Sequence, residues 1–343
     1  MHTIYTIQML RGIAAIMVLL YHLLPQYKAM GGEIAFFHKT FQWGFMGVDI
    51  FFIISGFIMA YTTFTKERNM LNAKTFIKHR LFRVYLGYWP FFFTMFFAWL
   101  FVNPDKLKSL DIINSFFLTS QQIDELVLPV SWSLGYELYF YFLFLFTFFF
   151  SRKQLYLYIP AFIGLIFLLV FYSYYKSVIP ESFFYSPYLL EFFAGVLLYM
   201  YKDHLMKLWI LPVNIIIIVI SLSYASVSYD GGYEFLRVVT FGTTALLIVH
   251  SALILEHNHI YKVGKIFQTL GDASYTLYLS HTIIMIFFYF VGLREVFTSH
   301  TSELLPIIGS LLIIMISIVF SLVYYKKIER PLYQKAINYK RSS

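Results

Sequence analysis

The chain of 343 residues contains no cysteine, which excludes disulfide bonds, thiolate nucleophiles and cysteine-ligated metal sites. Charged residues are also scarce, at 13% of the chain, whereas a soluble domain usually has about 25%. Too few polar side chains are present to cover a water-soluble globule. The sequence therefore predicts a polytopic membrane protein.

Other signatures are missing as well. The sequence has no glycine-rich loop of the dinucleotide-binding or P-loop kind, no internal repeat and no long polar segment. We therefore expect a single transmembrane domain over residues 1–343 with no appended soluble domain. The net charge of +8 does not indicate a nucleic-acid partner, because the cations cluster between apolar stretches. His257 and His259 have too common a spacing to indicate a metal site, so we expect no metal.

The abundant residues of the chain are apolar and aromatic. Hydrophobic residues make up 59% of the chain, and its 40 Phe and 29 Tyr suit lipid-facing surfaces and interfacial belts. Since a spanning helix needs roughly 20 largely apolar residues, the sequence predicts an all-α protein with about ten transmembrane helices. Their ranges are 4–24, 44–64, 86–103, 131–150, 155–175, 184–200, 208–226, 235–254, 273–291 and 304–325. No small-x-small cleavage site follows the first, so we expect it to be retained.

The charge of the loops predicts the orientation. Loop 65–85 contains six Lys or Arg residues and one Glu, whereas loop 104–130 contains two Lys and four acidic residues. Because cytoplasmic loops carry the excess of Lys and Arg, both termini are predicted to be cytoplasmic, as an even number of spans requires. We expect an integral protein of the bacterial inner membrane.

The first predicted helix carries Arg11 and His22 within apolar sequence. Eleven helical steps place them on one face, about 16 Å apart along the axis. A guanidinium in hydrocarbon costs several kcal/mol unless it is paired or hydrated, so we expect a polar cavity, in which His22 supplies a base. The alternatives are an ion pair of Arg11 with Asp49 or Glu191, and an interfacial histidine without a catalytic role.

Two further helices carry polar residues at informative spacings. Glu137 lies four residues from both Ser133 and Tyr141, so the three share one helical face. Asp49 and Ser55, by contrast, point in different directions on the second predicted helix, which suggests either different roles or a break of the helix at its glycines.

Several separated motifs occur in a fixed order along the chain. They are Arg11 with His22, GFMGVDIFFIISGF (44–57), RLFR (80–83), SWSLGYELYFY (131–141), EFFAG (191–195), GDASYTLYLSH (271–281) and ERPL (329–332). Together they resemble the integral membrane acyltransferase-3 family from Arg11 to about Leu332. One departure is that a proline often follows the arginine pair within a few residues, whereas here the nearest is Pro90.

The resemblance implies transfer of an acyl group, usually acetyl, from cytoplasmic acyl-coenzyme A to a carbohydrate hydroxyl. Typical acceptors are surface polysaccharides and their lipid-linked precursors. His22 would be the general base, a role that contributes typically 10²–10⁴-fold. Arg11 would assist catalysis and contact the donor, and Glu137 would orient His22 or bind the acceptor.

Other motif residues would bind the two substrates. Arginine forks suit the phosphates of coenzyme A, so Arg80 and Arg83 are expected to bind the donor, although cations in such a loop also set topology. Ser55 and His281 would line the donor path, unless His281 is a hydrogen-bonded core residue. The residues expected to bind the acceptor are Trp132, Asp49 and Glu191. Trp132 is equally compatible with an ordinary aromatic belt.

Two rival functions stay open. A transporter or flippase for a lipid-linked sugar or an anion also carries intramembrane charges, but such proteins often show inverted repeats, which we do not find. The other is a protein that only relays an acyl group to a partner enzyme.

Overall fold

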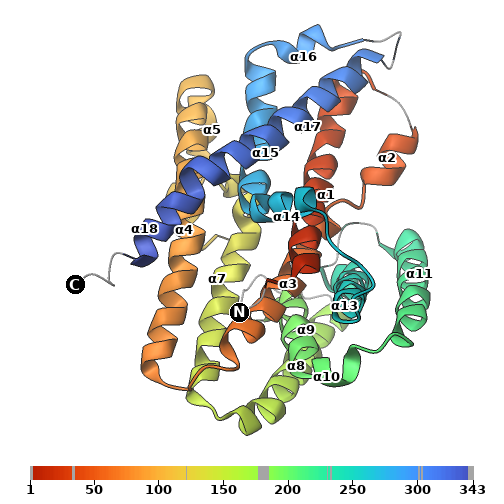
Figure 1. The fold of residues 1–343 in the computed structure, drawn as a ribbon. Coiled ribbons are helices and arrows are strands. Elements are labelled where there is room, and N and C mark those ends of the chain that lie inside the picture. Colours follow the sequence, from red (N-terminus) through yellow and green to blue (C-terminus); the bar gives the residue numbers. More distant parts are fainter. Residues whose placement is uncertain are drawn as a thin grey trace. The chain divides into compact units, whose positions relative to one another are not determined.

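A computed structural model describes residues 3–32, 35–120, 122–176, 185–229, 231, 234–299, 302 and 304–338. These residues form helices and connecting loops, with no strand among them (Figure 1). Within these ranges, eight helices are long and apolar enough to cross a membrane, or nine if one bent pair counts as a single span. The predicted all-α membrane class is confirmed.

The chain forms two compact units from interleaved segments, so that α1, α3 and α4 each pass from one unit into the other. Unit 1 comprises Met1–Leu10, Asp49–Leu81 and Ser133–Gly264. Unit 2 comprises Arg11–Val48, Phe82–Trp132 and Lys265–Ser343.

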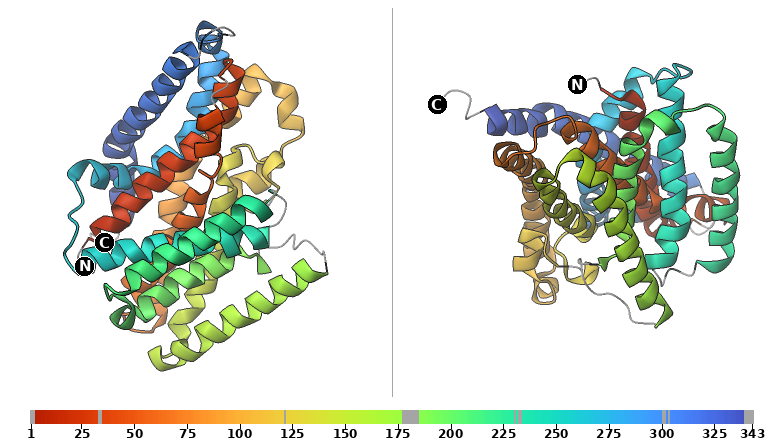
Figure 2. Two further views of the ribbon diagram at one scale, coloured as in Figure 1. Left: turned by 90° about the vertical axis from the view of Figure 1, so that its right-hand side faces the viewer. Right: turned by 90° about the horizontal axis from the view of Figure 1, so that it is seen from below.

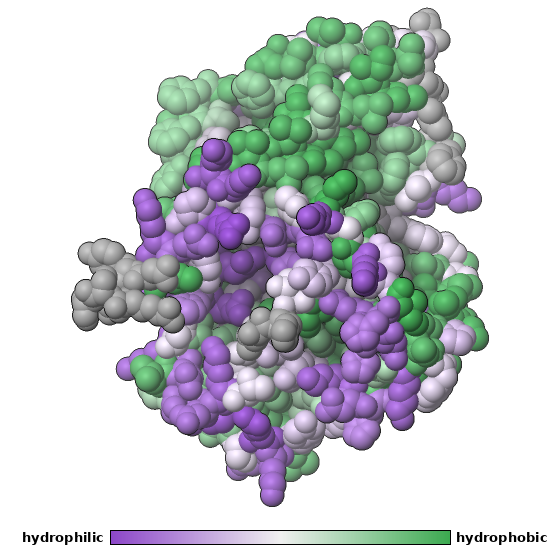
Figure 3. Space-filling view, viewed as in Figure 1, coloured by the Kyte–Doolittle hydropathy of each residue, from purple (hydrophilic) through white to green (hydrophobic). Residues whose placement is uncertain are grey.

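Unit 2 holds most of α1 and the C-terminal helices, among which α15 packs along α17 (Figure 1). Its elements are α1 (Tyr5–Ala29), α2 (Ala35–Phe41), α5 (Pro104–Lys108), α6 (Ile112–Phe117), the 3₁₀ turns η1 (Ile123–Glu125) and η2 (Pro129–Ser131), α14 (Lys265–Asp272), α15 (Ser274–Phe290), α16 (Leu293–Val296), α17 (Leu304–Tyr324), the π-helical turn η6 (Tyr325–Glu329) and α18 (Arg330–Asn338). Figure 3 shows apolar side chains over the outward face of α17, and hydrophilic ones where η6 and α18 follow.

Unit 1 is built from the middle of the chain, where α11 runs beside α13 (Figure 2). Its elements are α3 (Met46–Thr63), the first part of α4 (Met70–Val102), α7 (Trp132–Leu145), η3 (Phe146–Phe149), α8 (Arg152–Tyr175), α9 (Tyr188–Met200), α10 (Lys202–Leu205), α11 (Ile210–Ser228), α12 (Glu234–Arg237), the π-helical turn η5 (Val238–Gly242) and α13 (Thr243–His257). Only 11% of the most apolar stretch of α11 is buried inside the protein. This helix therefore presents its aliphatic side chains to lipid.

Two glycines let α3 and α9 pack closely inside unit 1. A Cβ atom on Gly56 would lie 1.8 Å from the backbone oxygen of Phe192, and one on Gly195 would lie 2.0 Å from the backbone oxygen of Ile53. Neither distance is possible for a real side chain. Small residues at helix contacts allow this approach between membrane helices, and it fixes α9, with Glu191, against α3.

Two predictions along the chain differ from the structure, and a third predicted span agrees with it but is bent against the helix before it. Residues 70–85 are not a loop but the start of α4. Their charged side chains interrupt the apolar sequence, but they do not interrupt the helix. The predicted span 273–291 is α15, which is bent by 68° from α14. The predicted span 184–200 contains α9, whose 13 residues reach only about 20 Å, less than the roughly 30 Å of a bilayer core; residue 184 lies outside the described residues.

Candidate functional site

Two histidines from distant parts of the sequence meet in unit 2. Nδ1 of His22, on α1, lies 3.2 Å from Nε2 of His281, on α15. Each ring also faces a carbonyl of its own helix: Nδ1 of His22 is 2.9 Å from the oxygen of Val18, and Nδ1 of His281 is 3.1 Å from the oxygen of Leu277. His281 is fully buried, and His22 is half-buried.

The carbonyl contacts assign the protons of the pair. A carbonyl oxygen only accepts, so Nδ1 of His281 carries its proton and Nε2 of the same neutral ring is an acceptor. Nδ1 of His22 then donates, to Val18 and to His281. In this arrangement Nε2 of His22 is the nitrogen that holds a lone pair.

The surroundings of the pair are aromatic. The ring of Tyr21 meets that of His22 edge-on, with centroids 5.2 Å apart.

The hydroxyl of Tyr278, on α15, donates to the backbone oxygen of Val130 at 2.7 Å. This bond ties α15 to η2, and the half-buried Trp132 begins α7 directly after that turn.

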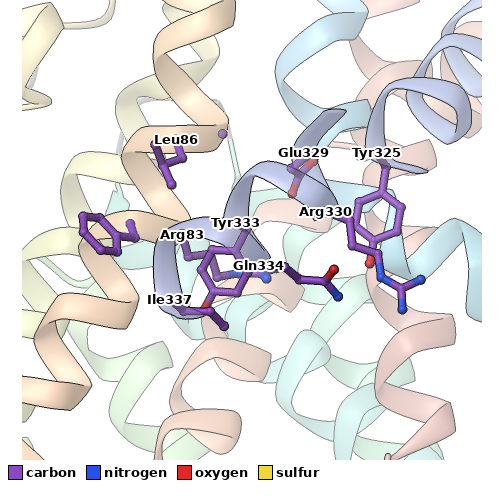
Figure 4. A pocket seen from close by; sticks show the side chains of 10 residues that line it. Arg83, Leu86, Tyr325, Glu329, Arg330, Tyr333, Gln334 and Ile337 are labelled. Carbon is purple, nitrogen blue, oxygen red and sulfur yellow. The ribbon is translucent and has the colours of Figure 1, made fainter. Parts of the chain in front are cut away.

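A second polar group of unit 2 surrounds Glu329, at the end of η6. Thr276 donates a short hydrogen bond to its carboxylate. Arg11 and Arg83 are its cationic neighbours, so the structure brings two predicted donor-binding arginines to one acidic residue. Arg330, the next residue in the chain, points away from this carboxylate (Figure 4).

A pocket of about 280 Å³ lies between α4 and the η6–α18 stretch of unit 2. It combines arginine, tyrosine and aliphatic side chains (Figure 4). The lining residues are Phe82, Arg83, Leu86, Gly87, Tyr325, Glu329, Arg330, Tyr333, Gln334 and Ile337. Such a pocket can hold an anionic group beside an aromatic or aliphatic one.

In unit 1, the carboxylate of Glu137 on α7 accepts two hydrogen bonds. One comes from Ser55 of α3 at 3.3 Å, and a short one comes from Tyr141, as the predicted shared face requires. The Arg80 guanidinium lies 5.7 Å from the ring centroid of Tyr141. Arg80 and Arg83 thus have different neighbours, although a single turn separates them in the sequence.

Asp49, in unit 1, is paired with an arginine that sequence reasoning missed. Nη2 of Arg237 lies 2.8 Å from Oδ2 of Asp49, and Nε lies 3.1 Å from Oδ1. Nη1 of the same guanidinium donates to the hydroxyl of Tyr188 at 3.2 Å. Asp49 and Ser55 thus contact different side chains, and α3 is unbroken between them. Arg237 lies near the start of the predicted span 235–254. It is therefore an arginine within a predicted transmembrane helix, the same pattern that indicated a role for Arg11.

Glu191 lies beside this ion pair and is 2% exposed. Neither of its carboxylate oxygens has a hydrogen-bond partner among the described residues. A Cβ atom on Gly242 would come within 2.5 Å of one of these oxygens, so this glycine, at the end of the π-helical turn η5, makes room for the carboxyl. π-Helical turns are frequent at functional sites.

Comparison with known proteins decides the family. A match to the family described as "Acyltransferase domain" covers residues 4–326. The chain belongs to the acyltransferase-3 family. It is also similar to "Exopolysaccharide production protein ExoZ" of Rhizobium meliloti (strain 1021), with 29% identity over 255 residues, 71% of this chain and 77% of that protein. No solved protein structure matches it significantly.

This acyltransferase is an integral membrane protein, and the family match contains both histidines, Arg11 and Arg83. The match ends at residue 326, before Glu329 and α18, so part of the pocket lies beyond it. Within the described ranges, no cluster of three or more His, Asp or Glu side chains is arranged to hold a metal ion.

Proposed function

We propose that this acyltransferase transfers an acyl group, acetyl by preference, from acyl-coenzyme A to a hydroxyl of a cell-surface carbohydrate or its lipid-linked precursor. The carbohydrate acceptor is supported by the similarity to ExoZ, whose name refers to exopolysaccharide production. The whole chain acts as one transmembrane domain in the inner membrane, with both termini in the cytoplasm. The loop charges support this orientation.

The histidine pair is the observation that carries the mechanism. Because His281 accepts from Nδ1 of His22, the lone pair of Nε2 is directed away from the pair and serves as the general base. It takes the proton of the acceptor hydroxyl while the hydroxyl oxygen attacks the thioester carbonyl carbon. The C–O bond forms, the C–S bond breaks, and the leaving sulfur receives the proton. The products are an ester and a thiol.

The donor binds from the cytoplasmic side. Arg83 in the α4–α18 pocket contacts a phosphate of coenzyme A, and Arg11, on the helix of His22, contacts the donor arm nearer the thioester. The pocket of about 280 Å³ is slightly smaller than the ~300–1,000 Å³ of typical ligand sites, so it accommodates part of the donor. Arg80 and Ser55 contribute to donor binding from unit 1.

Acceptor binding uses the remaining predicted residues. Trp132 stacks on a sugar ring, for which its half-buried position after η2 is suitable. Glu137 hydrogen-bonds a hydroxyl of the acceptor, while Asp49 and Glu191 shape a polar region of unit 1.

The decisive experiment is acyl transfer in inside-out membrane vesicles with radiolabelled acetyl-coenzyme A and cell-envelope glycans. Wild type is compared with His22→Ala and with a matched control, His204→Ala, which removes an exposed histidine. Label in a base-labile glycan ester with wild type and the control, but not with His22→Ala at equal protein level, supports the proposal.

Two other results contradict it. Equal labelling by His22→Ala removes this residue from the mechanism. Absence of transfer from every acyl-coenzyme A tested, with native acceptors present, rejects the donor class and favours a transporter or flippase.

A further inference from the structure

One arginine of unit 1 has no acidic partner among the residues that the structure describes. Arg68 lies in the loop between α3 and α4, where its guanidinium packs 5.1 Å from the ring centroid of Phe64 and 5.3 Å from that of Phe148. All three of its side-chain nitrogens are shielded from solvent, and none donates a hydrogen bond to a residue that the structure describes.

The acidic residue next to it in sequence does not compensate this charge. The carboxylate of Glu67 accepts from the side-chain amide of Asn69 at 3.2 Å, and its backbone oxygen accepts from Asn72 at 3.0 Å. These bonds organise the start of α4 and hold Glu67 as part of the loop.

The charged neighbour of Arg68 is a second cation, Arg152, at the first residue of α8. Nη2 of Arg152 donates to the backbone oxygen of Thr65 at 3.0 Å, which holds it against the same loop. Burial and the Arg152 guanidinium both lower the pKa of Arg68 from its ordinary value. The loop therefore holds two like charges together.

The beginning of α8 adds to this positive region. Ser151 caps the helix by a capping box with Gln154, and the 24-residue helix that follows directs the positive end of its dipole to this point. Two guanidinium groups beside a helix N-terminus make an environment that favours an anion.

A buried, unpaired charge is costly, and native proteins compensate it with a partner, water or an ion. Contact with two phenylalanine rings supplies some cation–π attraction, but it satisfies none of the N–H donors. The five N–H groups of Arg68 are a planar set whose geometry matches phosphate oxygens.

We propose that Arg68 and Arg152 form a phosphate-binding site at the end of unit 1 where α3 ends and α8 begins. The ligand carries a phosphate group, which two available molecules provide: coenzyme A and an anionic phospholipid. Neither arginine is among the residues that line the pocket at Arg83, and the binding of phosphate by this site does not depend on acyl transfer.

The test measures the unfolding temperature of the full-length protein in detergent as coenzyme A or phosphatidylglycerol is titrated. A ligand that binds the folded state raises this temperature in a saturable way. We expect Arg68→Gln and Arg152→Gln to weaken the apparent affinity by about tenfold to a hundredfold, the effect of losing a charged hydrogen bond. Arg68→Lys should retain part of the affinity and shows that the loop still folds.

Lys66→Gln is the matched control, because it removes an exposed positive charge from the same loop. Its affinity should change by less than about threefold, as exposed charges contribute little. A dependence on Arg68 seen with coenzyme A alone assigns the site to the donor, and one seen with phosphatidylglycerol alone assigns it to a lipid headgroup. If both ligands act equally on wild type and Arg68→Gln, the proposal is wrong.

Discussion

Nδ1 of His22 lies 3.2 Å from Nε2 of His281, although 259 residues separate them in the sequence. Both rings also meet a carbonyl of their own helix, and these contacts fix the direction in which the protons point. In the proposed mechanism His281 is a positioning residue that acts through His22.

The first prediction concerns this positioning. Replacing His281 by Ala removes one of the two acceptors for Nδ1–H of His22, so we expect kcat to fall about two- to tenfold, the value of a neutral hydrogen bond. The KM for the acyl donor should stay nearly constant. His281→Gln places an acceptor near the same position and should recover part of the loss. A larger effect on donor KM than on kcat would instead place His281 on the donor path.

The second prediction concerns the link between Tyr141 and Glu137. Tyr141→Phe removes the hydroxyl donor and retains the ring that packs against Arg80. Since the half-buried carboxylate of Glu137 then loses a hydrogen-bond donor, we expect activity to fall about two- to tenfold at unchanged protein level. Tyr172→Phe, at a position that is 62% exposed, is the matched control and should leave activity unchanged. Equal activity of all three proteins would show that this bond is not needed.

The third prediction tests the close contact between α3 and α9. Gly56→Ala would place a Cβ atom 1.8 Å from the Phe192 oxygen, so the helices must separate. We expect a loss of about 1–3 kcal/mol, typical of overpacking, seen as a lower unfolding temperature in detergent. Gly164→Ala on α8 meets nothing within 4 Å and should be neutral or slightly stabilising. If both substitutions have the same effect, the contact is less tight than the structure shows.

The parts of the site that the sequence could predict are those that depend on a single helix. The spacing of Glu137 and Tyr141 gave their shared face, and the spacing of Asp49 and Ser55 gave their divergence, because helical rotation per residue is constant. The spacing of residues along one helix does not determine which residues of another helix they contact. Neither the meeting of His22 with His281 nor the neighbourhood of Arg11, Arg83 and Glu329 is encoded in local spacing.

A prediction of helices from hydropathy also excludes charged residues that belong to the end or the beginning of a helix. The charged residues of 65–85 interrupt the apolar sequence, which predicts a loop between two spans. Most of this segment is instead the beginning of α4. Arg237 was overlooked for a related reason, since it precedes the most apolar part of its segment. Its role became visible only with Asp49, a partner 188 residues away.

The fourth prediction tests that buried pair. Asp49→Asn leaves the Arg237 guanidinium without its counter-charge, and breaking a buried pair from one side costs about 3–5 kcal/mol. We expect a large drop in unfolding temperature and in the amount of protein in the membrane. The double variant Asp49→Leu with Arg237→Met removes both charges and should recover much of that stability.

The exposed ion pair between Asp105 and Lys108, whose side chains are 86% and 80% exposed, is the control for this cycle. Asp105→Asn should have no measurable effect, because an exposed pair contributes little. If the double variant is as stable as wild type but transfers no acyl group, the pair serves acceptor binding in addition to folding. If Asp49→Asn alone is as stable as wild type, the pair does not hold α3 to α12.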